Sequence, residues 1–125
     1  MSVCSDELLI LAELLIDGNN EASNRASMSR SYYALYHEAT SAAQALLLPP
    51  ANDVKTAHEG LIGRYSSSSK GLAALGRAMR KQKQLRAKAD YDIRDNINAS
   101  DAKLHLANSR RLVMDLRRIC SPPSL

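Results

Sequence analysis

Apolar residues recur along the chain every three or four positions, and no stretch alternates between apolar and polar residues as a half-buried strand would. This spacing is typical of amphipathic helices. It predicts five helices, over about residues 6–17, 21–48, 53–65, 70–87 and 101–120. We therefore expect an all-α fold, an antiparallel helical bundle of about five helices.

Capping and helix-breaking residues mark the predicted ends of these helices. N-caps favour Ser, Asp and Asn, whereas Gly, Pro and serine runs end helices or separate them. In chain order the candidates are Ser5, Gly18, Asn19 or Asn20, Pro49–Pro50, Asp53, Ser66–Ser69, a loop at Ala89–Asp92, and Ser100–Asp101. The tail from about residue 121, which holds Pro122–Pro123, is expected to be disordered.

The helix over 21–48 is expected to be central, because it is the longest and its second half is rich in small residues. Its core-facing stripe consists of Met28, Tyr32, Leu35, Ala39, Ala42 and Leu46. The helix over 6–17 is apolar around most of its circumference, which implies burial on more than one side, within the chain or against another one. The inward positions of the last two helices are Leu72, Leu75, Met79, Leu85, Leu106, Val113, Leu116 and Cys120.

A length of 125 residues predicts one domain, over 1–125, and its charge is unevenly distributed. Residues 1–60 carry eight acidic and three basic residues, whereas the rest carries fourteen basic and five acidic ones. The fourth predicted helix is the most basic stretch, with no acid to offset Arg77, Arg80, Lys81, Lys83, Arg86 and Lys88. Such a face is either solvated or binds a polyanion, most simply nucleic acid.

Several classes of site are not predicted. Cys4 and Cys120 lie near opposite ends of the chain without a CxxC spacing or a histidine cluster, which predicts reduced thiols, no metal site and no cofactor. The apolar run Leu8–Ile16 is too short to cross a membrane, and it follows acidic residues instead of the basic ones of a signal peptide. We predict a cytoplasmic protein with no membrane partner.

Candidate chemistry lies on the far side of the central helix. Seven residues bring a helix back to nearly the same direction, so Arg30 and His37 share a stripe that points away from the predicted core, with Tyr33 between them. His58 lies instead on the apolar stripe of the third helix. We interpret it as a packed, hydrogen-bonded histidine in preference to a ligand or catalyst.

Three motifs carry a family resemblance: Ser29–His37 (S-R-S-Y-Y-A-L-Y-H), Ala57–Ile62 (A-H-E-G-L-I) and Arg86–Tyr91 (R-A-K-A-D-Y). In this order and spacing they resemble small stand-alone HEPN proteins (higher eukaryotes and prokaryotes nucleotide-binding domain). The first motif of that family reads roughly S-R-x-Y-Y-A-x-[FY]-H. The resemblance covers about residues 5–120 and implies an antiparallel helical bundle that commonly forms a homodimer.

The resemblance also implies an activity. In catalytically competent HEPN proteins an Arg-x(4–6)-His motif from each of two domains meets at the dimer interface and cleaves RNA without a metal. The matching residues here are Arg30 and His37. The implied protein is an endoribonuclease that leaves 2′,3′-cyclic phosphate ends, in the role of a toxin or phage-defence effector. Its implied partner is a nucleotidyltransferase-like antitoxin.

In such a reaction Arg30 would bind the scissile phosphate and His37 would act as general acid or base, because imidazole titrates near neutral pH. Tyr33 could orient His37 or stack on a base. The residues expected to hold RNA nearby are Arg77, Arg80, Lys81, Lys83 and Arg86.

Structural roles remain open for the same residues. Arg30 and His37 could join helices across an interface through carbonyls or carboxylates such as Glu38. Arg86, Asp90 and Tyr91 could fix the turn between the last two helices through an Arg–Asp pair and a packed ring. In that case the protein is a non-catalytic HEPN subunit that binds a partner protein or nucleic acid.

Overall fold

The computed structural model describes residues 4–51 and 56–120, and these ranges form helices and no strand. The five helices are α1 (Ser5–Ile16), α2 (Glu21–Ala45), α3 (Ala57–Ser66), α4 (Lys70–Tyr91) and α5 (Ala99–Cys120). The all-α bundle predicted from the periodicity is therefore confirmed. The predicted disorder after residue 120 and the cap at Asp53 lie outside the described residues.

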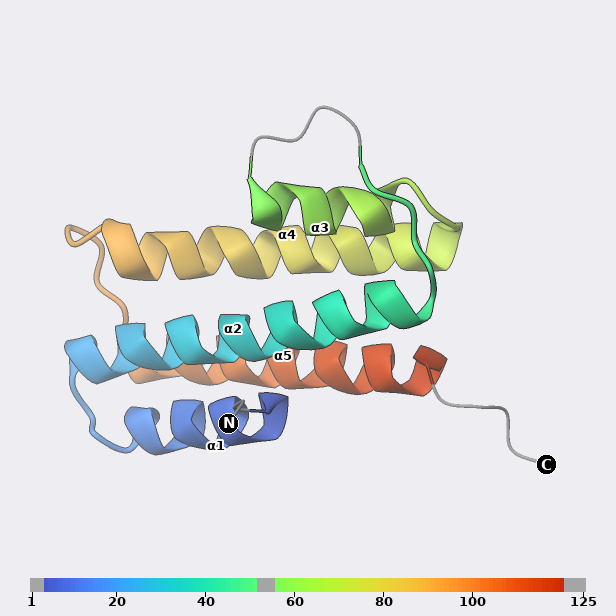
Figure 1. Cartoon of the computed structure of the whole chain (residues 1–125). Coiled ribbons are helices and arrows are strands. Elements are labelled where there is room, and N and C mark those ends of the chain that lie inside the picture. The colour runs from blue at the N-terminus through green and yellow to red at the C-terminus, as the bar shows by residue number, and fades with distance from the viewer. Residues whose placement is uncertain (1–3, 52–55, 121–125) are drawn as a thin grey trace.

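Helix α2 is the centre of the bundle, as predicted, and packs against each of the other helices. Figure 1 shows α1 on one side of α2, α4 with α3 on the other, and α5 behind. Helices α1 and α4 run in one direction, whereas α2, α3 and α5 run in the other (Figure 1). The central helix α2 is therefore antiparallel to α1 and α4 and parallel to α3 and α5.

The core forms mainly along α2, where Ala34, Ala39 and Ala43 are fully buried and allow the neighbouring helices to approach closely. The predicted stripe from Met28 to Ala42 is buried as expected, and Leu46 packs against it. Fully burying a side chain such as Leu35 contributes about 1.5–3 kcal/mol. Tyr65 of α3 lies in the same core, and its hydroxyl donates a hydrogen bond to the Ala39 carbonyl (2.7 Å).

One prediction about burial is wrong, and another is tested only within the single chain. There α1 buries one stripe, with Ile10 and Leu14 on its other side 58% and 61% exposed, and burial of that side against another chain stays a prediction. Cys120 is exposed instead of inward, and it belongs to the last turn of α5, which extends past the N-terminal end of α1 (Figure 1).

Helix ends differ from the predictions where side chains from other helices contact them. Helix α2 ends at Ala45 and not at 48, and the next residues turn through Leu47 in the left-handed region (φ 55°). The side chain of Arg64 in α3 donates to the Leu48 carbonyl at 2.6 and 3.1 Å, which holds this turn. Asn20, one of the two predicted candidates, caps α2 by accepting a hydrogen bond from the Ser23 amide.

The N-caps of α1 and α5 differ from the predicted residues. Ser5 lies inside α1, whose N-cap is Cys4. Helix α3 is capped by Thr56. The cap of α5 is a reciprocal pair in which the amides of Asn98 and Asp101 each donate to the other residue's side chain, so the cap lies two residues before the predicted Ser100.

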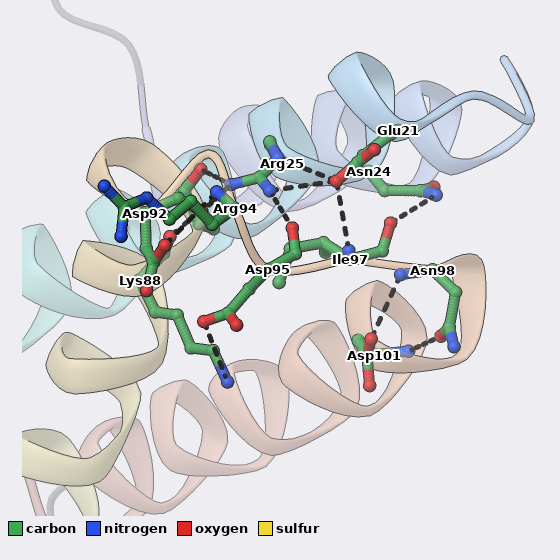
Figure 2. A network of polar contacts seen from close by, with 11 residues as sticks. Glu21, Asn24, Arg25, Lys88, Asp92, Arg94, Asp95, Ile97, Asn98 and Asp101 are labelled. Atoms are coloured by element: carbon green, nitrogen blue, oxygen red, sulfur yellow. Dashed lines mark hydrogen bonds and ion pairs between the residues drawn. The ribbon is translucent and has the colours of Figure 1, made fainter.

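Helix α4 continues to Tyr91, through the loop predicted at Ala89–Asp92. The reason is Arg25 of α2, a residue that the sequence pattern did not single out. Figure 2 shows its guanidinium at the centre of a polar network. It donates to carbonyls in the last turn of α4 and in the following loop, those of Lys88 (3.5 Å), Ala89 (2.8 Å), Asp92 (3.0 Å) and Asp95. The Lys88 carbonyl also accepts from the Asp92 amide (3.0 Å), and the carbonyls near a helix end have few other backbone donors, so the arginine stabilises the extra turn.

Glu21 completes this network. Its carboxylate accepts hydrogen bonds from Arg25 (2.9 Å) and from the Ile97 amide (3.3 Å) (Figure 2). The hydrogen bond from Arg25, followed by that from Ile97, lowers the pKa of Glu21. The start of α2 and the loop before α5 are therefore joined by one carboxylate–guanidinium pair.

A second buried polar network joins α2, α4 and α5. His105 is 1% exposed, its Nδ1 lies 2.7 Å from the Ser31 hydroxyl, and its Nε2 lies 3.1 Å from the Gln82 carbonyl. Because a carbonyl only accepts, Nε2 carries the proton and Nδ1 accepts from Ser31. The Gln82 side-chain amide donates in turn to the His105 carbonyl and to the Ser109 hydroxyl. The network fixes the side of α2 opposite Tyr33.

The buried imidazole makes stability depend on pH. Burial lowers the pKa of His105 from its usual 6.5. The unfolded chain then binds a proton that the folded chain does not, so stability falls as pH drops below about 6.5. Between pH 7.5 and 5.5 we expect the free energy of unfolding to fall by about 1 kcal/mol from this residue. Urea denaturation at the two pH values, with His105→Gln as control, measures this change, and equal free energies in the parent would contradict it.

Candidate active site

The candidate site begins with three side chains on the exposed stripe of α2. The Arg30 guanidinium carbon lies 5.6 Å from the centre of the Tyr33 ring, and that ring lies 6.5 Å from the His37 ring. Arg30 and Tyr33 are half-buried, whereas His37 is exposed. The structure therefore brings the three residues together in a line, with the tyrosine between the two predicted catalytic residues.

Arg30 and His37 make no hydrogen bond or ion pair with any residue that the structure describes. Glu38, which the structural interpretation offered as a partner, pairs instead with Arg117 of α5 (2.8 Å). Within the described chain the two residues thus hold no helices together, and the imidazole of His37 is open to solvent.

His58 of α3 lies behind this line. Its Nδ1 is 2.8 Å from the Tyr32 hydroxyl, and its ring packs on Tyr36 at 4.6 Å. Burial, together with the positive charges of Arg86 and Lys83, lowers the pKa of His58, and burial raises that of the Tyr32 hydroxyl. The interpretation of His58 as a packed, hydrogen-bonded histidine is confirmed. His58 also supports the exposed stripe, because it packs on Tyr36, whose ring lies 5.8 Å from that of His37.

Arg86 of α4 is directed into the same cluster and is only 6% exposed. Its guanidinium carbon lies 5.0 Å from the centre of the Tyr32 ring and 5.6 Å from that of Tyr33. Burial opposes its charge, but the hydrogen bond and charge of Asp90 (3.1 Å) outweigh it and raise the pKa of Arg86. The predicted Arg–Asp pair is therefore present. The packed ring is not, because Tyr91 is 76% exposed.

The predicted RNA-binding residues of α4 are thus not one continuous basic face. Arg86 is buried, and Arg80 and Lys83 both pair with Glu59 of α3. Lys88 pairs with Asp95 of the next loop. The expectation that no acid offsets these charges is wrong, because the acids come from outside α4. Within the described residues Arg77 and Lys81 remain exposed without an ion pair.

Sequence reasoning missed Glu59, Gln82 and His105 as polar partners. Glu59 directly follows His58 in the second motif. Its carboxylate could have predicted an ion pair with the basic residues of α4. The positions of Gln82 and His105 on the inner faces of α4 and α5 were the available signals for the buried network.

The described residues contain no group of three or more His, Cys, Asp or Glu side chains arranged to hold a metal ion. None of the helices described is long and apolar enough to span a membrane. Comparisons with protein-family models, with curated proteins and with solved structures find no match to this chain. A functional conclusion therefore depends on the residues and their geometry.

Proposed function

We propose that this protein is a metal-independent endoribonuclease of HEPN type, which acts through Arg30 and His37. The observation that carries the proposal is the exposed line of Arg30, Tyr33 and His37, in which neither Arg30 nor His37 has a hydrogen bond or ion pair with a described residue. An arginine without an ion pair and an accessible imidazole on one stripe supply a phosphate-binding cation and an acid or base, which metal-independent phosphodiester cleavage can use.

The chemistry is an internal transesterification. An RNA 2′-hydroxyl attacks the adjacent phosphorus, the bond from phosphorus to the 5′-oxygen breaks, and a 2′,3′-cyclic phosphate and a free 5′-hydroxyl result. His37 takes the proton from the 2′-hydroxyl or gives one to the leaving 5′-oxygen. Arg30 donates to the phosphate oxygens as negative charge develops on them.

One chain presents one exposed imidazole at this site, whereas the reaction uses both a base and an acid. A homodimer that brings two copies of the exposed stripe together would supply both. This arrangement fits a toxin or defence effector restrained by a partner protein, such as a nucleotidyltransferase-like antitoxin.

The test is the cleavage of a mixed RNA pool by the purified protein in EDTA. We expect cleavage without added metal and products that carry 2′,3′-cyclic phosphate and 5′-hydroxyl ends. A DNA pool of the same sequences serves as control, because DNA lacks the attacking 2′-hydroxyl. Cleavage of both pools, or cleavage that EDTA abolishes, would contradict the proposal.

The exposed apolar side chains of α1 favour a second candidate, a non-catalytic subunit that binds a partner protein. Ile10 and Leu14 lie one turn apart and are both more than half exposed. Two results together would support partner binding in place of ribonuclease activity. The folded protein would leave RNA intact, and the substitution Leu14→Asp would abolish its complex with a partner protein.

A further inference from the structure

Arg86 is a buried arginine with one hydrogen-bond donor left unpaired by the residues that the structure describes. It has one ion pair, with Asp90, and its Nε has no hydrogen-bond partner among the described residues. Burying a guanidinium carries a desolvation cost unless its donors are paired. An apolar side chain of similar length would fill the same space without this cost. The pair with Asp90 uses one guanidinium nitrogen and does not explain why a side chain with a further donor, unpaired in the described part of the chain, is buried here.

The two rings beside Arg86 give a reason. Its guanidinium lies against Tyr32, which belongs to the core, and against Tyr33, which belongs to the exposed stripe. Tyr33 in turn contacts Arg30 on one side and His37 on the other. One buried cation is thus connected, through a single ring, to both proposed catalytic residues.

We propose that Arg86 is a positioning residue, which fixes the Tyr33 ring between Arg30 and His37 and does not contact RNA itself. This inference rests on the proposed ribonuclease function. The attraction between a cation and an aromatic face is stronger where water is excluded, so it can hold a ring that is itself half-exposed. A displacement of about 1 Å in a reacting group can cost about 100-fold in rate, so the ring position would matter for turnover.

The test replaces the guanidinium and separates turnover from binding. In Arg86→Met, we expect kcat to fall about 10-fold to 100-fold, with KM for an RNA oligomer within about twofold of the parent. Arg86→Lys, which keeps a cation near the rings, should be intermediate. The fold should survive, because Asp90, which loses its partner, is partly exposed and can be hydrated. If Arg86→Met does not fold, Arg86→Lys carries the comparison. Arg111→Met, at an exposed position of α5, is the matched control.

A second readout does not need activity. In NMR spectra of protein labelled in its Tyr and His rings, Arg86→Met should shift the Tyr33 and His37 signals. The signals of Tyr65 and His105, which belong to the core, should be retained. This pattern distinguishes a local change in ring position from a general loss of structure.

The outcomes separate the two proposals. If the parent cleaves RNA and Arg86→Met has the parental kcat, or raises KM alone, the positioning role is overturned while the ribonuclease stands. If the parent does not cleave RNA, the proposed function fails, and the ring signals decide the role of Arg86. Unchanged Tyr33 and His37 signals then overturn it, and shifted signals support it.

Discussion

Replacing either Arg30 or His37 with alanine is expected to lower the rate of RNA cleavage at least about 100-fold, because each removes a group that acts in the transition state. The loss should appear in kcat. Neither side chain has a hydrogen bond or ion pair with a described residue, so both variants should unfold at nearly the parental temperature. Initial rates on a labelled RNA oligomer in EDTA, beside thermal unfolding curves, measure both effects.

The matched control for Arg30→Ala is Arg111→Ala, which removes an exposed arginine from α5 and should leave the cleavage rate unchanged. His58→Gln tests whether any histidine near the site would have the same effect. His58 is hydrogen-bonded to Tyr32 and half-buried, so its loss should act mainly on stability. Cleavage by His37→Ala at the parental rate would refute the assignment of His37 as acid or base.

The largest expected effect on stability is that of Arg25→Met. The substitution removes the donors to the carbonyls at the end of α4 and in the next loop (Figure 2). It also leaves Glu21 without its guanidinium partner. Several hydrogen bonds from a charged group are lost together, so the free energy of unfolding should fall by about 2–4 kcal/mol. Urea denaturation at pH 7.5 measures this change, and Tm should fall by roughly 10 °C.

Arg94 provides the control for this prediction, because it is an arginine of the same loop whose side chain is exposed (Figure 2). Arg94→Met should change the free energy of unfolding by less than about 0.5 kcal/mol. The stability of Arg25→Lys should be intermediate. Its ammonium keeps the charge but lacks the planar fork with which a guanidinium reaches several carbonyls. Equal stabilities of Arg25→Met and Arg94→Met would show that the network of Arg25 contributes nothing to folding.

The sequence alone determined the helices and the line on α2. Within one helix the direction of each side chain follows from the fixed rotation of about 100° per residue. The spacing of Arg30, Tyr33 and His37 was therefore enough to place them on one side, and that of Met28 and Leu35 was enough to place those residues in the core. Helix number and the N-cap at Asn20, one of the two candidates, likewise depend on local sequence, and they were predicted correctly.

Only the tertiary structure decided which residues from different helices meet. In the sequence, Arg86 is one more cation of a basic helix. In the structure it is buried, because the face of α4 that carries it packs against Tyr32 and Tyr33. The pairing of Lys83 with Glu59 depends in the same way on α3 lying along α4. Arg25 extends α4 from a position more than 60 residues away in sequence. Such contacts arise from packing between helices. The spacing of residues within one helix does not tell which residues of another helix they meet.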